Sequence, residues 1–191
     1  MRIVSGEWGG RTLLAPRGDA VRPTQDRVRQ ILFDILGRRV IGAAVLDLYA
    51  GTGALGLEAL SRGATSVVFV ESSARARAAL EANRQALGAG ARTRLLAMSV
   101  AGALTKLESE GRRFDWILAD PPYDLGEDIR LIERLGREGD LLIAPDGGVV
   151  IETRRESALT EAVGRLERVR VRPAGGTMLH FFERRALEVA R

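Results

Sequence analysis

The sequence predicts an α/β protein built on a doubly wound, mostly parallel sheet. Short apolar runs typical of buried strands alternate with stretches at helical spacing, the pattern of parallel strands covered by helices on both faces. A glycine turn with G-x-G-x-x-G spacing, Gly51, Gly53 and Gly56, follows the first of these strands. The last two apolar runs are joined by Pro173-Ala174-Gly175-Gly176, which predicts a closing antiparallel hairpin and a seven-stranded sheet.

The chain begins with a glycine- and arginine-rich stretch outside this pattern. Two apolar runs flank a glycine-rich turn there, which predicts a small β-hairpin. We therefore divide the 191 residues into an N-terminal extension (1–24), one main domain (25–185) and a C-terminal tail (186–191). The hairpin has two equally weighted interpretations: it covers a sheet edge, or it is a basic arm that contacts phosphates, with Trp8 available for stacking.

The first helix is expected to begin near Thr24, which can cap it, and to end at Gly37. Its apolar residues recur at helical spacing and form a core stripe. The same reasoning places strands and helices in alternation along the rest of the chain. The expected strands are 45–48, 66–70, 94–97, 114–119, 149–152, 166–171 and 177–182; the expected helices are 54–61, 73–87, 101–107, 128–135, 138–143 and 157–165, with a turn at 145–148.

Composition narrows the classes of function. There is no cysteine, so disulfides and zinc–thiolate sites are excluded, and the single histidine, His180, excludes a histidine metal cluster. We expect no metal. The N-terminus lacks an apolar signal region and no apolar run approaches the length of a membrane span, which predicts a cytoplasmic protein without membrane contact.

Nearly all the positive charge is arginine, because Lys106 is the only lysine and the net charge is +4. Genomic base composition accounts for much of that bias. The position of the arginines is more informative: Arg22, Arg27 and Arg29 crowd the start of the first helix, where the backbone potential is already positive. A polyanionic partner would explain this crowding.

In a sheet of this kind, ligands bind at the carboxyl ends of the strands, near the point where strand order reverses. Asp47 interrupts the first apolar strand, and Glu71 ends the second strand about 20 residues past the glycine turn, where an acid commonly binds ribose hydroxyls. A buried acid needs a partner, which favours a ligand over a simple cap for Asp47. The predicted cofactor site consists of Asp47, Tyr49, Ala50, Gly51, Gly53, Glu71, Ser72, Met98, Ser99 and Thr24.

The acidity of this edge favours S-adenosylmethionine over a dinucleotide. The glycine loop contains no lysine or arginine of the kind a phosphate-binding P-loop uses. S-adenosylmethionine has no phosphate but has an ammonium, a sulfonium and a ribose diol. Asp47 suits the ammonium, directly or through water, and Glu71 can accept both ribose hydroxyl protons.

A second motif, Asp120-Pro121-Pro122-Tyr123, follows the fourth strand. The prolines fix the backbone and remove two donors, leaving carbonyls that can only accept hydrogen bonds. The Asp120 carboxylate and the Pro121 carbonyl can then hold both protons of an exocyclic amine, so that its lone pair faces a methyl sulfonium. Catalysis would be positioning and electrostatics, and Tyr123 can stack on the base. The four residues are the predicted catalytic group.

With the glycine loop and Glu71, this motif resembles the S-adenosylmethionine-dependent amino methyltransferases. That resemblance leaves adenine N6, cytosine N4, guanine N2 or a protein glutamine open as the substrate. The N-terminal segments Arg2-Ile3-Val4-Ser5-Gly6, Gly10-Arg11 and 22–29, together with 48–63, are similar to the bacterial 16S ribosomal RNA guanine-N2 methyltransferase family. Ser5 departs from the expected glycine or alanine, and the tip Met98-Ser99 lacks the acid that many methyltransferases direct at adenine.

The resemblance implies a Rossmann-like methyltransferase fold and methyl transfer from S-adenosylmethionine to N2 of one guanine of 16S ribosomal RNA in the small subunit. The base would be splayed out to reach the pocket. RNA contacts are then expected at Arg2, Trp8, Arg11, Arg22, Arg27 and Arg29, in a protein that we expect to be monomeric. The alternatives are an adenine-N6 nucleic-acid methyltransferase, a nicotinamide-dependent oxidoreductase, which would leave 120–123 unexplained, and a non-catalytic RNA-binding assembly factor.

Overall fold

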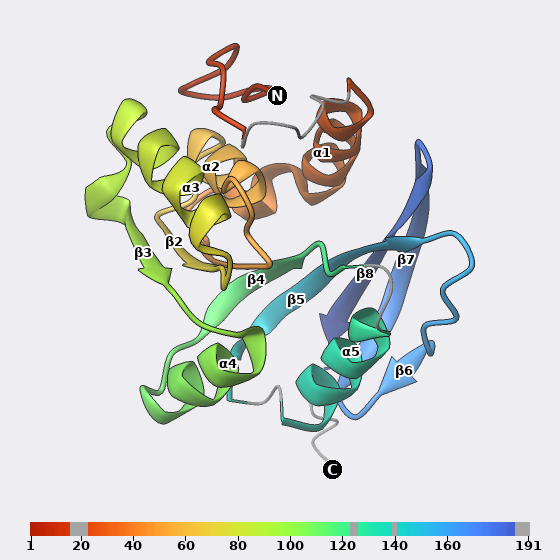
Figure 1. Ribbon diagram of the computed structural model, residues 1–191. Helices are drawn as coiled ribbons and strands as arrows, with labels where there is room; N and C mark the ends of the chain where they lie inside the picture. The colour runs from red at the N-terminus through yellow and green to blue at the C-terminus, as the bar shows by residue number, and fades with distance from the viewer. Residues whose placement is uncertain (16–22, 123–125, 139–140, 186–191) are drawn as a thin grey trace.

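The computed structural model describes residues 1–15, 23–122, 126–138 and 141–185. Within them, one sheet of eight strands has the order β3-β2-β1-β4-β5-β8-β7-β6 (Figure 1). The first five strands of that order are parallel, and β8, β7 and β6 continue it in antiparallel pairing. The strands are β1 (Ala44–Leu48), β2 (Ser66–Val70), β3 (Thr93–Leu96), β4 (Phe114–Ala119), β5 (Ile143–Arg154), β6 (Ala162–Val163), β7 (Leu166–Ala174) and β8 (Thr177–Arg184).

Helices cover both faces of the sheet, as the alternating pattern predicts. Neighbouring residues of β1 enter opposite cores: Val45 packs with α1, α2 and α3, whereas Leu46 packs with α4 and α5 (Figure 1). The strand order reverses between β1 and β4, because β2 and β3 lie on one side of β1 whereas β4 and β5 lie on the other. A ligand site is expected at this place. The helices are α1 (Pro23–Leu36), α2 (Ala54–Ser61), α3 (Ala74–Ala86), α4 (Val100–Ser109) and α5 (Glu127–Glu138), with 3₁₀ turns η1 (Gly37–Val40) and η2 (Gly90–Arg92).

The N-terminal segment is part of the same core. Its predicted hairpin is reduced to one isolated antiparallel bridge between Arg2 and Thr12. Ile3, Trp8 and Leu13 are buried among the side chains of α1, α2 and α3. The segment therefore covers helices and not a sheet edge, because its apolar residues find their partners on the outer face of α2 and α3.

Three predicted elements are wrong. The expected turn at 145–148 lies inside β5, because Gly147 and Gly148 allow close backbone approach: a Cβ on Gly148 would lie 2.4 Å from the Phe182 carbonyl oxygen. The expected helix at 157–165 contains β6, since left-handed Gly164 (φ +55°) turns the chain back onto β7. This adds an eighth strand to the seven predicted. The expected helix at 138–143 is replaced by the end of α5 and the start of β5, with 139–140 outside the described residues.

Candidate active site

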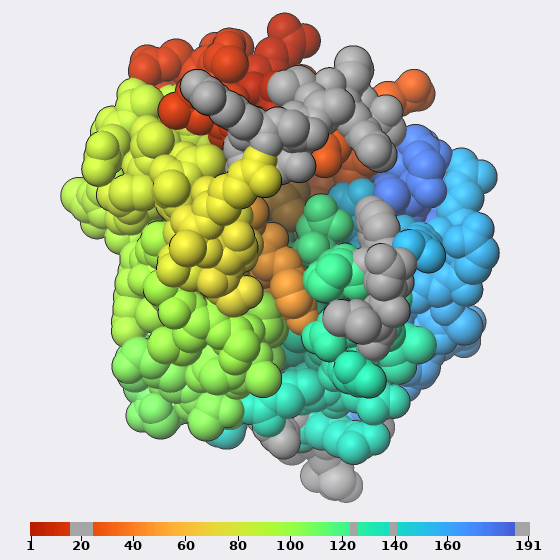
Figure 2. All heavy atoms as spheres, in the orientation of Figure 1, coloured from red at the N-terminus to blue at the C-terminus, as the bar shows by residue number. Residues whose placement is uncertain are grey.

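The predicted cofactor and catalytic residues that follow β1, β2, β3 and β4 lie at one edge of the sheet. Strand pairing places Leu48 beside Val70 on β2 and Ala119 on β4, so the residues that follow β1, β2 and β4 are neighbours. Residues 98–99 follow β3 at the same edge. Figure 2 shows the surface hollowed here, between the yellow segment after β2 and the green segment after β4. The prediction of this edge from strand order is therefore confirmed.

The glycine loop needs left-handed backbone at three positions. Gly51 (φ +56°) and Gly53 (φ +81°) adopt it without a Cβ penalty. Tyr49 (φ +57°) is the one described non-glycine residue with positive φ, a conformation that costs on the order of 1–3 kcal/mol. Gly56 serves packing instead: a Cβ there would lie 2.4 Å from Phe69 Cε1. The loop thus brings α2 tightly onto β2 and leaves backbone open at its turn.

The Glu71 carboxylate connects the ends of two elements at this edge. Its Oε2 accepts the Gly51 N–H at 2.8 Å, and its Oε1 accepts the Ser73 N–H at 2.7 Å. Ser73 in turn caps α3 by accepting the Ala76 N–H at 3.4 Å. Each carboxylate oxygen retains a second lone pair, so Glu71 is oriented by the loop and can still accept hydroxyl protons.

Asp47 is buried at the base of the loop, 1% exposed. Its Oδ2 accepts the Gly56 N–H at 2.9 Å, which holds the first turn of α2, while its Oδ1 has no partner among the described residues. Burial, opposed by the Gly56 hydrogen bond and reinforced by repulsion from Glu71, raises the pKa of Asp47 to about 7. This orphaned acceptor fits a cation or a water that bridges to one.

Tyr49 links the glycine loop to α5. Its hydroxyl donates to Glu127 Oε2 at 3.1 Å, from the first turn of the helix that follows the Asp120 segment. Desolvation and the Glu127 carboxylate raise the pKa of Tyr49, so the phenol stays protonated and keeps donating. Sequence reasoning missed Glu127, because no local pattern joins a strand end to a helix 78 residues later.

Asp120 directly follows β4, at the edge that the glycine loop shares. Asp120 is exposed, whereas the next residue, Pro121, is buried. The surrounding protein nevertheless displaces much of its water, and this desolvation, with repulsion from Glu152 and Asp47, raises the pKa of the Asp120 carboxyl above its ordinary value. A carboxylate whose charge is disfavoured before any ligand binds is typical of a functional position.

The other predicted residues differ in what the structure says of them. Ser99 caps α4 by accepting the Gly102 N–H at 3.3 Å, and Met98 is half-buried beside it. Ser72 is exposed, and its carbonyl accepts from the Arg77 guanidinium. Tyr123 and Arg22 lie outside the described residues; Thr24 lies in the first turn of α1, not before it, and its side chain lies outside the description.

Two of the residues predicted to bind RNA are buried and make internal contacts. Arg29 is 4% exposed and donates to Asp26 and to the Arg2 carbonyl. Trp8 is 7% exposed, and the Arg92 guanidinium lies 4.8 Å from the centre of its ring. Trp8 as a stacking surface and Arg29 as a phosphate ligand are therefore corrected to packing residues, because the extension is docked on the domain.

The remaining arginines of this set are more exposed. Arg2 pairs loosely with Asp26 at 3.7 Å, and Arg11 donates to the Ala86 carbonyl at 2.8 Å. Arg27 is exposed near the start of α1, and no partner for it is found among the described residues. Of the predicted RNA ligands, Arg27 is thus the one whose described surroundings leave it available.

Two residues of α2 hold the N-terminal segment in place. Fully buried Glu58 accepts the Val4 N–H at 2.6 Å and the Ser5 N–H at 3.1 Å. Ser61 donates to the Ser5 carbonyl at 2.5 Å and accepts the Trp8 N–H at 2.9 Å. The two segments that carried the family resemblance, near residues 5 and 58, are therefore in contact.

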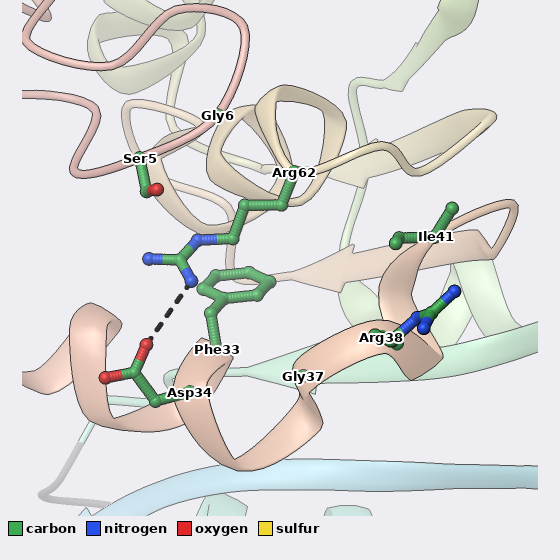
Figure 3. Close-up of a pocket in the computed structure, with 8 residues that line it drawn as sticks. All are labelled: Ser5, Gly6, Phe33, Asp34, Gly37, Arg38, Ile41 and Arg62. Carbon is green, nitrogen blue, oxygen red and sulfur yellow. Dashed lines mark hydrogen bonds and ion pairs between the residues drawn. The ribbon is translucent and has the colours of Figure 1, made fainter.

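A pocket of about 480 Å³ lies under this docked segment, between the ends of α1 and α2 (Figure 3). Arg62 lies over the Phe33 ring, 5.3 Å from its centre, and its guanidinium reaches Asp34 at 3.5 Å. Because α2 runs away from the glycine loop, the pocket lies toward the opposite edge of the sheet from Asp120. Asp34 and Arg62 pair with each other there, and we assign the pocket no role in the chemistry.

Comparison with known proteins agrees with this arrangement. The family model described as Conserved hypothetical protein 95 matches residues 1–183. Ribosomal RNA small subunit methyltransferase D of Escherichia coli is 33% identical over 189 residues, covering 97% of this chain and 91% of that protein. The chain belongs to the ribosomal RNA small subunit methyltransferase D family. The resemblance inferred from the sequence is thus confirmed.

Solved structures place the methyltransferase D family fold on this chain. The structure of yhhF from Escherichia coli is 33% identical with a TM-score of 0.82, over 97% of this chain and 98% of that one. The Thermus thermophilus 16S rRNA N2 methyltransferase RsmC, solved with AdoMet and guanosine, is 27% identical with a TM-score of 0.65. That match covers 88% of this chain and 45% of RsmC. The predicted α/β methyltransferase fold is confirmed.

The described part of the chain contains neither a metal-binding cluster nor a membrane-spanning helix. No three His, Cys, Asp or Glu side chains gather there as a group that could hold a metal ion. Within the same ranges, no helix is both long and apolar enough to cross a membrane.

Proposed function

We propose that this protein transfers a methyl group from S-adenosylmethionine to the exocyclic N2 amine of a guanine in 16S ribosomal RNA of the small subunit. The observation that carries the proposal is the placement of Asp120 beside the glycine loop and Glu71 at the point where strand order reverses. Membership of the methyltransferase D family and the likeness to RsmC, solved with AdoMet and guanosine, support the reaction class. We further propose that it works as a cytoplasmic monomer.

The residues present fit the cofactor. Glu71 keeps free lone pairs facing the loop, so it would accept from the ribose diol. The unpartnered Oδ1 of Asp47 would accept from the ammonium or from a bridging water. Met98 and Ser99 lie after β3, next to β2, and would contact the adenine. When bound, S-adenosylmethionine supplies an electrophilic methyl group on a sulfonium.

Catalysis then depends on holding the amine. The guanine N2 lone pair is delocalised into the ring, so the amine is a weak nucleophile. The Asp120 carboxylate and the Pro121 carbonyl would each accept one N–H, which turns the lone pair toward the methyl group. The N–C bond would form as the bond from the sulfonium sulfur to the methyl group breaks, which leaves a neutral thioether. The nitrogen would become positive, and its acidic proton would pass to Asp120 or to water. The proposal keeps Tyr123 as the stacking surface for the base.

The test is methyl transfer to small ribosomal subunits that lack the modification, with methyl-labelled S-adenosylmethionine. The RNA is then digested to nucleosides. We expect label in N2-methylguanosine at one 16S site. Label in N6-methyladenosine would keep the cofactor and the amine chemistry but overturn the guanine assignment. Absence of label with intact cofactor binding would overturn the proposed reaction.

Replacing Glu71 by glutamine is expected to weaken S-adenosylmethionine binding by about tenfold to a hundredfold, since one acceptor oxygen becomes an NH2 group that cannot accept from a ribose hydroxyl and the other loses its charge. Calorimetric titration measures this directly. Glu81→Gln on the outer side of α3 is the matched control and should bind normally. Equal affinities for the two variants would remove Glu71 from the cofactor site.

Activity is expected to fall as the pH is lowered through the raised pKa of Asp120, because the protonated acid is a weaker acceptor for the amine. A profile of kcat/KM between about pH 5 and pH 9 should show this acid limb well above the ordinary pKa of an aspartate. Asp47, whose pKa is about 7, also titrates nearby. The limb should persist in Asp47→Asn; its disappearance there would transfer the titration to Asp47.

A further inference from the structure

The edge strand β7 has an unusual pattern of exposed charge. Its central residues Arg168 to Arg172 alternate arginine with valine, and the last four of them are exposed. Its outer edge is paired with β6 at only two positions, Glu167 and Leu166. From Val169 to Pro173 the residues are exposed, and no described strand pairs with this part of the outer edge of β7.

Register shows which face of the sheet these side chains share. Arg170 pairs with Phe181, and Arg172 with Leu179, and both partners belong to the core on the α1 side. Arg168 pairs with Phe182 of the opposite core, because the register shifts between Arg168 and Arg170. Two exposed arginines therefore lie on the α1 face of the sheet, and α1 contacts β7 there.

The same register connects Arg172 to the active site. Arg172 pairs with Leu179, and Leu179 pairs with Glu152. Ala119 pairs with Ile151, so the next residues along, Asp120 and Glu152, are neighbours, which agrees with the repulsion that Glu152 exerts on Asp120. Three strand spacings of about 4.8 Å put β7 roughly 14 Å from β4.

Charge balance distinguishes these two arginines from most others. Many other arginines are neutralised by nearby acids, as in Arg94 with Glu110 and Arg62 with Glu58. Among the residues that the structure describes, no acid or carbonyl partners Arg170 or Arg172. On the opposite face, Arg168 is held by the Leu159 carbonyl at 2.8 Å.

We propose that the α1 face of β7, through Arg170 and Arg172, binds the ribosomal RNA backbone beside the target nucleotide. This inference rests on the proposed function and extends it, because it places the RNA grip across Asp120 from the cofactor and not on the N-terminal segment. Planar guanidinium groups suit phosphate contact. Arg27 is also exposed, near the start of α1, the helix that contacts β7. The competing explanation is that charge on an edge strand only blocks strand-to-strand aggregation.

The test is the double variant Arg170→Ala/Arg172→Ala, with Arg38→Ala/Arg112→Ala as a control that removes the same charge from exposed, unpaired sites outside β7. Affinity for unmethylated small subunits is measured by filter binding at several salt concentrations. The β7 variant should bind about tenfold more weakly, and the slope of log affinity against log salt should fall by about 2. S-adenosylmethionine affinity and kcat at saturating subunits should stay unchanged. Arg170→Lys/Arg172→Lys should restore most of the slope.

The outcomes separate the inference from the function on which it rests. If the wild-type protein methylates subunits and the β7 variant binds them as the control does, RNA binding by Arg170 and Arg172 is overturned while the proposed function stands. A variant that aggregates while its soluble fraction binds normally would also overturn it, in favour of edge protection. Wild-type protein that neither binds nor methylates subunits would overturn the proposed function itself.

Discussion

Asp120→Ala is expected to lower kcat for methyl transfer by about a thousandfold while leaving S-adenosylmethionine affinity nearly unchanged. The carboxylate supplies one of two acceptors that would orient the amine. Among the described residues, no other acid directly follows β4. Its raised pKa adds a second expectation. Because ionised Asp120 is repelled by Glu152 and Asp47, its removal should leave the folded protein as stable as before, or more so.

This combination separates a catalytic role from a structural one. A residue needed for folding would lose stability and activity together, whereas Asp120→Ala should lose activity alone. Single-turnover kinetics and urea denaturation measure the two effects. Asp120→Asn keeps the shape but presents an amide, and we expect it to be almost as inactive. Asp146→Asn is the matched control and should be fully active. Asp146 is an exposed acid in the part of β5, between Ile143 and Gly148, that is not paired with β4.

The active edge could be predicted because its information is local. The apolar runs 66–70 and 114–119 coincide with β2 and β4, since a parallel strand buried on both faces has little freedom in composition. Each strand ends at an acid, and parallel strands bring their ends together whatever their separation in the chain. The sequence alone therefore predicts that Glu71 and Asp120 lie at one edge of the sheet.

The wrong predictions arise where the outcome depends on partners that are distant in the sequence. Composition marks Arg29 and Arg170 alike as cations, yet Arg29 is buried by Asp26 and the Arg2 carbonyl, whereas Arg170 remains exposed. Which arginine finds a partner depends on how the N-terminal segment docks, a contact across more than 50 residues. Strand β6 and the glycines inside β5 were missed for the same reason, because tertiary packing overrides their local turn signals.

Glu58 holds the N-terminal segment docked on α2. Glu58→Ala is expected to lower the free energy of unfolding by about 3–5 kcal/mol, because it leaves half-buried Arg62 without its main partner and the Val4 and Ser5 amides without an acceptor. Glu58→Gln keeps one acceptor oxygen and should cost about 1–3 kcal/mol. Glu81→Ala, which breaks the partly exposed pair with Arg84, should cost about 0–1 kcal/mol. Urea denaturation gives all three values.

Loosening this contact should also reach the cofactor loop. Buried Asn83 donates to the carbonyls of Leu14 and Thr52, so the end of the N-terminal segment and the glycine loop are held by one side chain. In Glu58→Ala we therefore expect faster amide exchange at Val4 and Ser5 and weaker S-adenosylmethionine binding. If Glu58→Ala unfolds as readily as Glu81→Ala does, the segment is not held by Glu58. If it is destabilised while cofactor affinity stays normal, the segment supports the fold without supporting the site.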